Sequence, residues 1–247
     1  MVDAATPADG AAELRAALRT LCDRHGIVLI GDEVQAGMAR TGRMFGFEHA
    51  GVAPDLVTMA KGLAGGFPLS AVTGRAEIVD APAPGGIGGT YAGHPLAVAA
   101  AEAVLDVIAE DDLCARADQI GRVIRDRLTA LAARPGFACI GEVRGLGAMN
   151  ALEFVTDRRT NAPDAAITSA IVAEAEARGL ILLACGTRYN VIRLLPPLTI
   201  PPAQLDEALD IIEASIEAAA MKQAQIEGER RVVYDRPLDL AFPNWIR

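Results

Sequence analysis

The chain lacks the cysteine and histidine spacings that metal sites and disulfide frameworks require. Its four cysteines are widely separated and form no CxxC pair, and its three histidines show no metal-ligand spacing. A zinc site needs ligands at short, regular spacing, and a disulfide framework needs clustered cysteines. We therefore predict no metal centre and assign a structural role to all seven residues: Cys22, Cys114, Cys139, Cys185, His25, His49 and His94.

Basic residues are also in deficit. The sequence contains 23 lysines and arginines against 32 aspartates and glutamates, which gives a net charge of −9. Nucleic acids and anionic membranes are bound mainly through basic side chains, so neither is expected as a partner. No apolar run is long enough to span a membrane. The first ten residues lack the basic and apolar regions of a secretory signal, so we expect a reduced, cytoplasmic location.

What the sequence does contain is an alternation of short apolar runs and amphipathic stretches. This pattern indicates an α/β protein, and 247 residues suffice for one large domain or two small ones. Proline and glycine dominate residues 81–89, where we expect a loop. The predicted strands are 27–31, 55–60, 69–74, 148–154, 180–184 and 191–194, and the predicted helices are 11–25, 96–109, 115–133, 165–178 and 203–220.

Two of these strands deliver chemically useful residues at their carboxyl ends, where α/β sheets bind ligands. The first, which we expect to be buried, leads into Asp32, and the second leads into Lys61 in a glycine-rich setting. A lysine that forms a Schiff base needs a positioned, desolvated amine, and a bound pyridinium ring needs a carboxylate at its nitrogen. Asp32 and Lys61 could supply these two groups. As alternatives, such an aspartate also caps turns, and a lysine before glycine also occurs as an exposed loop charge.

The sequence around these two residues resembles a known family. Residues 32–42 (DEVQAGMARTG), 53–56 (APDL) and 60–69 (AKGLAGGFPL) are similar to the central segment of class III pyridoxal-phosphate-dependent aminotransferases, and within them most resemble 4-aminobutyrate aminotransferases. Asp32 and Lys61 then match the aspartate that pairs with the pyridine nitrogen and the Schiff-base lysine. The resemblance also implies that Val34 packs on a face of the cofactor ring and that Gln35 hydrogen-bonds its phenolic oxygen.

Thr90 precedes a predicted helix within residues 88–97 (GGTYAGHPLA). A hydroxyl beside free backbone amides at a helix start is a natural phosphate site, and threonine is also a common N-cap. The segment resembles the one in which the family's threonine reaches the cofactor phosphate of the neighbouring subunit. The resemblance therefore implies a homodimer with shared sites, although His94 stands where asparagine is expected.

A second α/β unit is expected after a boundary near residues 109–112. Residues 141–149 (GEVRGLGAM) and 185–200 (CGTRYNVIRLLPPLTI) resemble the small C-terminal domain of 4-aminobutyrate aminotransferases. Arg193 lies there on a predicted strand, where a guanidinium can pair with a carboxylate through two hydrogen bonds. From the residues alone, a structural salt bridge is the alternative. The resemblance implies that Arg193 binds the α-carboxylate of 2-oxoglutarate and glutamate.

The implied fold is that of a fold-type I pyridoxal-phosphate-dependent transferase, an α/β protein. We expect residues 1–110 to form part of the large cofactor-binding domain, with an incomplete, mostly parallel sheet, and residues 111–221 to form the small domain. Residues 222–247 depart from the family pattern and are expected to be disordered, with a docking segment as the alternative. The resemblance corresponds to the C-terminal half or so of a family member.

The resemblance implies transamination, in which an ω-amino group of a 4-aminobutyrate-like donor passes through pyridoxal phosphate to 2-oxoglutarate. Class III enzymes that act on ornithine, acetylornithine or a diamine would share every motif. Because the N-terminal portion of the family is not matched, three explanations are kept open. The chain is an inactive truncated product, a subunit whose site is completed by a partner that supplies the other half, or a fragment whose start is assigned too late.

Overall fold

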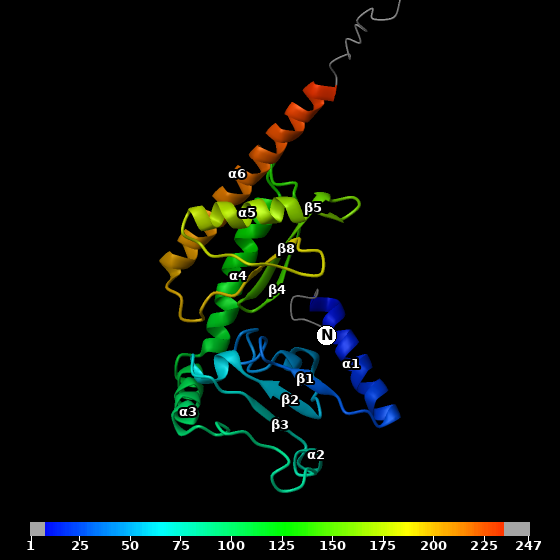
Figure 1. Cartoon of the computed structure of the whole chain (residues 1–247), viewed down its shortest axis with the longest axis vertical. Coiled ribbons are helices and arrows are strands. Elements are labelled where there is room, and N and C mark those ends of the chain that lie inside the picture. Colours follow the sequence, from blue (N-terminus) through cyan, green and yellow to red (C-terminus); the bar gives the residue numbers. More distant parts are fainter. Residues whose placement is uncertain (1–7, 235–247) are drawn as a thin grey trace, which may run out of the picture.

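The computed structural model describes residues 8–234, and the side chains of residues 13–225. Its helices and strands form two units stacked along the long axis (Figure 1). The lower unit, residues 8–110, comprises α1 (Ala8–His25), β1 (Ile30–Asp32), η1 (Gly46–Ala50), β2 (Leu56–Met59), η2 (Lys61–Ala64), β3 (Ala71–Gly74), α2 (Ala76–Val79) and α3 (Pro95–Glu110). The upper unit, residues 111–234, comprises α4 (Leu113–Ala132), β4 (Ile140–Leu146), β5 (Met149–Asp157), β6 (Ala162–Pro163), α5 (Ala165–Ala177), β7 (Ala184–Cys185), β8 (Val191–Leu194) and α6 (Pro202–Tyr234).

A three-stranded sheet in the order β1-β2-β3 forms the base of the lower unit. β1 and β2 are parallel, with Asp32 opposite Thr58, whereas β2 and β3 are antiparallel. The expectation of a mostly parallel sheet is therefore wrong for β3. A parallel return needs a crossover of a dozen or more residues, usually with an α-helix. The segment between β2 and β3 holds only the short helix η2 and a glycine-rich turn, so the chain returns antiparallel.

β1 is shorter and more exposed than its apolar sequence predicts. The strand begins at Ile30 rather than at residue 27, and Ile27, Val28 and Ile30 are 52%, 46% and 56% exposed. The reason is that, within residues 8–234, β1 is an edge strand with β2 on one side only. An apolar run predicts that apolar neighbours cover it, but the described residues cover only part of each of these side chains.

The sheet of the upper unit has the order β4-β5-β8-β7, and each of these pairs is antiparallel. The predicted strands at 148–154 and 191–194 are confirmed by β5 and β8. The predicted strand at 180–184 is wrong. The Leu180 amide donates to the Ala175 carbonyl at the end of α5, and pairing with β8 begins only at Ala184.

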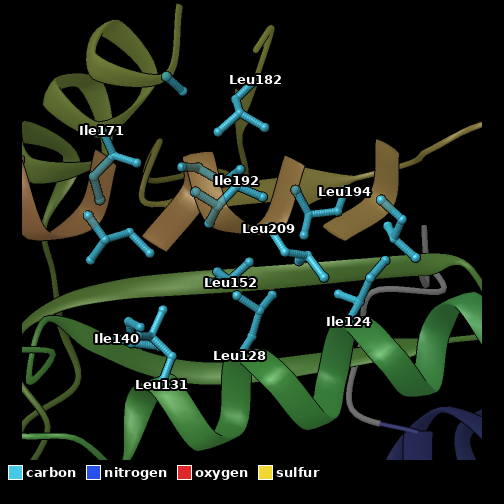
Figure 2. Close-up of a cluster of buried hydrophobic side chains, with 14 of the residues drawn as sticks. Ile124, Leu128, Leu131, Ile140, Leu152, Ile171, Leu182, Ile192, Leu194 and Leu209 are labelled. Carbon is cyan, nitrogen blue, oxygen red and sulfur yellow. The ribbon is translucent and has the colours of Figure 1, made fainter. Parts of the chain in front are cut away.

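One apolar cluster holds the upper unit together (Figure 2). α4 contributes Ile120, Ile124, Leu128 and Leu131, which recur at helical spacing and are at most 3% exposed. Because α5 and α6 add side chains to the same cluster, all three helices of the upper unit pack as one body with its sheet. Figure 2 labels further members of the cluster, among them Leu152, Ile171, Ile192, Leu194 and Leu209.

α6 continues well past the predicted helix and projects beyond the rest of the upper unit (Figure 1). Residues 222–234, for which disorder is expected from the sequence, are described as the continuation of α6, whereas residues 235–247 lie outside the described residues. Lys222 forms an ion pair with Glu174, and Gln223 donates to Asp164 Oδ2 at 3.2 Å, so the extension is tied to α5 at its start. Among residues 8–234, no helix combines the length and apolar character needed to cross a membrane.

The fully buried Phe154 side chain provides a test of this core. Replacement by alanine removes its contacts and leaves a cavity, so we expect Phe154→Ala to lower the free energy of unfolding by about 3–5 kcal/mol. Val123→Ala, at an exposed position of α4, is the control and should change it by about 0.5 kcal/mol or less. Urea unfolding followed by circular dichroism measures both values. Equal, small effects would contradict the packing described.

Candidate active site

The structure places Asp32 and Lys61 at one edge of the lower sheet. Asp32 is the last residue of β1, and Lys61 follows the end of β2. Because β1 and β2 are parallel neighbours, their carboxyl ends lie side by side, with Asp32 opposite Thr58. A carboxylate and an amine thus project from the edge at which α/β sheets bind ligands.

The Asp32 carboxylate is partly used by its own surroundings. Its Oδ1 atom accepts a hydrogen bond from the Val34 amide at 3.1 Å and one from Thr58 Oγ1 at 3.4 Å. Asp32 therefore does cap the turn that follows β1, which was the structural alternative. Both bonds fall on one oxygen and the side chain is exposed, so the carboxylate is also open to a further donor.

Lys61 has a backbone conformation that side-chain-bearing residues rarely adopt. Its φ is +49°, in the left-handed region, at the first residue of η2. Such a conformation costs about 1–3 kcal/mol and persists only where the surroundings impose it, most often at functional sites. Leu63 and Ala64, which follow Lys61 in η2, are buried in a small cluster with Met38, which anchors η2 while the Lys61 side chain stays exposed.

Glu33, between Asp32 and Val34, is a residue that the sequence interpretation passed over. Its buried carboxylate accepts hydrogen bonds from the Gly46 and Phe47 amides at 2.8 and 2.9 Å. Burial raises the pKa of Glu33, although the two amides act in the opposite direction. The strand alternation that exposes Asp32 turns Glu33 inward. Glu33 thereby fixes the turn that carries the half-buried Val34 and Gln35.

Asp55 links the segments that flank the lower sheet at the end away from Asp32. Its buried carboxylate accepts from the Leu29 amide at 2.7 Å, from Arg19 at 2.9 Å and from Arg75 at 3.0 Å. The backbone amide and the two guanidinium groups hold the pKa of Asp55 well below its ordinary value. This single carboxylate joins α1, the approach to β1 and the end of β3.

Thr90 does not lie with these residues in the chain as described. It is exposed in an open groove of about 980 Å³ that residues of β2 and β3 line together with residues 87–93. Neither Asp32 nor Lys61 lines that groove. The N-cap alternative is wrong, because the N-cap of α3 is His94.

Arg193 lies in the upper unit, on β8 and opposite Ala151 of β5. Its neighbours Ile192 and Leu194 are buried in the helix-covered core, so strand alternation turns the half-buried Arg193 toward the other face of the sheet. The two units meet near this strand, since Arg40 of the lower unit donates to the Pro196 carbonyl, just beyond β8.

The class of protein follows from a match over most of the chain. Residues 9–216 match the model of the family described as aminotransferase class-III. The chain belongs to the class III aminotransferases, a family that uses pyridoxal phosphate, and the resemblance inferred from the motifs is confirmed.

Two of the similar proteins are named as aminotransferases of 4-aminobutyrate and of 5-aminovalerate. The chain is 54% identical over 202 residues to 4-aminobutyrate aminotransferase of Escherichia coli (strain K12). The aligned region covers 82% of this chain and 47% of that protein. It is 54% identical over 203 residues to 5-aminovalerate aminotransferase of Pseudomonas putida, with coverages of 81% and 47%. The chain thus spans about half the length of these relatives.

Solved structures also match this chain over about half of their own length. A transaminase from the marine bacterium Virgibacillus matches with a TM-score of 0.80 and 29% identity, over 86% of this chain and 50% of that chain. The ornithine aminotransferase of Toxoplasma gondii matches with a TM-score of 0.74 and 34% identity, over 89% and 48%. The α/β fold expected from the sequence is therefore that of class III aminotransferases over about half of their length.

The Asp55 hydrogen bonds predict a pH-dependent contribution to stability. Because the pKa of Asp55 is lowered in the folded protein, its carboxylate stabilises the fold above the ordinary aspartate pKa of about 3.9, and this stabilisation is lost as the pH falls further. We expect Asp55→Asn to lower the thermal unfolding midpoint at pH 7, and the difference from the parent to shrink below about pH 4. Exposed Asp126→Asn is the control, with little change at either pH. A constant difference across this range would show that Asp55 does not act through its charge.

Proposed function

We propose that this chain supplies the cofactor lysine and the small domain of a transaminase that acts on straight-chain ω-amino acids. The observation that carries the proposal is the placement of Asp32 and a strained Lys61 at the ends of adjacent parallel strands. In the overall reaction, the donor's terminal amine is replaced by an aldehyde oxygen, and the carbonyl of 2-oxoglutarate is replaced by the amine of glutamate.

The residues present fit the ring end of pyridoxal phosphate. Asp32 has an open carboxylate for the ring nitrogen, Val34 and Gln35 lie in the adjoining turn, and Lys61 supplies the amine. When bound, the cofactor supplies an electron sink for the carbon that loses a proton. Lys61 Nζ would hold the cofactor covalently and, once released, would carry the proton. Asp32 would keep the ring nitrogen protonated.

Arg193 is proposed to hold the carboxylate of the acceptor. A guanidinium on a strand has a fixed donor fork that matches a carboxylate, which places the oxo acid in one orientation. The support is its position on the sheet face opposite the helix-covered core.

The donor class is supported by the relatives. Those named for 4-aminobutyrate and 5-aminovalerate act on straight chains with an amine at one end and a carboxylate at the other. This favours an ω-amino acid over a diamine. Ornithine is kept as the second candidate, because an ornithine aminotransferase is among the similar structures.

The proposed site needs more polypeptide than this chain describes. Lys61 is exposed, whereas an amine that reacts in this way is normally desolvated. Thr90, the proposed phosphate ligand, lies in a separate groove. We propose that a second subunit brings its Thr90 to this site, and that polypeptide equivalent to the other half of the relatives covers the lysine. An inactive remnant is the alternative.

Covalent trapping tests the assignment of Lys61 as the cofactor lysine. The sequence contains two lysines, Lys61 and Lys222, so an adduct on a lysine side chain is assigned to one of two positions. With pyridoxal phosphate and borohydride, we expect a stable adduct on Lys61 by peptide mass spectrometry. The adduct should persist in Lys222→Arg and disappear in Lys61→Arg. An adduct divided equally between both lysines, or found on Lys222 alone, would contradict the proposed site.

Glutamate formation from 2-oxoglutarate, assayed with the chain combined with an N-terminal half of a similar 4-aminobutyrate aminotransferase, then separates the donors. We expect turnover with 4-aminobutyrate or 5-aminovalerate in this mixture, and none above background in Lys61→Arg. Turnover with ornithine or a diamine alone would move the assignment to that donor. Trapping on Lys61 without turnover by any donor, even in the mixture with the N-terminal half, would favour the inactive remnant.

A further inference from the structure

Arg40, in the loop that follows β1, makes hydrogen bonds to residues that flank β5 and β8, the two central strands of the upper sheet. Its guanidinium donates to the carbonyl of Pro196, three residues beyond Arg193. Its own carbonyl accepts a hydrogen bond from the Ala148 amide at 3.0 Å, immediately before β5 begins at Met149. One residue therefore holds the start of β5 and the end of β8.

The same residue lies beside the Lys61 segment. A groove of about 400 Å³ is lined by Arg40 together with Gly62 and Gly65 of the lower unit and Leu198 and Thr199 of the upper unit. Arg40 thus shares one groove with η2, which begins with Lys61, and with the chain that leaves β8.

The loop around Arg40 packs against both the upper and the lower unit. Ala39 is fully buried in the core cluster of the upper unit, although it belongs to the lower unit. Met38 packs over Gly62, where an added Cβ would lie 3.4 Å from the Met38 Cβ. The loop consequently has neighbours in both units, and Arg40 lies next to the residue that enters the upper core.

The bond to Pro196 is the polar part of this contact. Burial lowers the pKa of Arg40, because a guanidinium in an apolar setting loses hydration. Arg40 is half-buried, and a charged donor that loses its acceptor in such a place is costly, so the interaction resists separation of the loop from Pro196. Arginine suits this role because its long, planar fork reaches across the interface as lysine does not.

We infer that Arg40 is a positioning residue, which holds the strand that carries Arg193 at a fixed place relative to the loop between Asp32 and Lys61. This inference rests on the proposed function. Arg40 acts through Pro196 and Ala148 on the acceptor site and not on the cofactor.

Amide hydrogen exchange tests the positioning directly, without any ligand. In Arg40→Met, we expect peptides that cover residues 146–151 and 190–200 to exchange at least about tenfold faster, whereas peptides of α5 keep the parent rate. Arg40→Lys, which retains a charged donor, should give an intermediate rate and serves if Arg40→Met does not fold. Arg43→Met, an exposed arginine of the same loop, is the matched control and should match the parent. Parent-like exchange in both Arg40 variants would overturn the inference.

Glutarate, a dicarboxylate without a reacting carbonyl, tests the consequence for the site. Calorimetry should show about tenfold weaker binding to Arg40→Met, with trapping of pyridoxal phosphate on Lys61 unchanged. Equal loss of trapping and of glutarate binding would mean a general structural role and would overturn the positioning claim. If the parent neither traps the cofactor nor binds glutarate, the proposed function fails, and the exchange rates still decide whether Arg40 holds the two units.

Discussion

The backbone contact between Gly147 and the loop that follows β1 is the constraint on which the described structure depends. Gly147 has a φ of +50°, and a Cβ atom there would lie 2.3 Å from the carbonyl carbon of Thr41. On its other side, a Cβ on Gly121 of α4 would lie 1.7 Å from the Gly147 carbonyl oxygen. Arg125 and Asn150 donate to that same oxygen at 3.2 and 3.1 Å. A helix, a turn and a loop from both units are therefore stacked at a distance that only glycine permits.

This contact determines how the two parts of the proposed site are related. Asp32 and Lys61 belong to the lower sheet, and Arg193 belongs to the upper sheet. Residue 148, next to the glycine contact, leads into β5, and β5 pairs with β8. The position of Arg193 is thus determined by the Gly147 backbone contact and by the register of the antiparallel pair of β5 and β8. It does not depend on a direct interaction between Arg193 and Lys61.

The sequence predicted what depends on local pattern and family resemblance. Helices at all five predicted positions are present, as are a strand that ends at Asp32 and a strand that ends shortly before Lys61, because periodicity and apolar runs decide them locally. β4 was not predicted, since Gly141 and Gly145 interrupt its pattern. Contacts between distant residues were beyond such reasoning, and the bond from Arg40 to Pro196 joins positions 156 residues apart. An apolar run also does not reveal which polypeptide covers it. Ile27, Val28 and Ile30, in and before β1, are largely exposed among the described residues.

The Lys61 backbone suggests how the functions of the site are divided. Its left-handed backbone lies at the start of η2, whose Leu63 and Ala64 are buried within this chain, so the place of the amine is set locally. The exposure of the side chain shows that desolvation is not set locally. In the proposed assembly, this chain determines where the lysine lies, and the polypeptide that covers it determines how strongly the amine reacts, because burial and not backbone geometry activates a lysine.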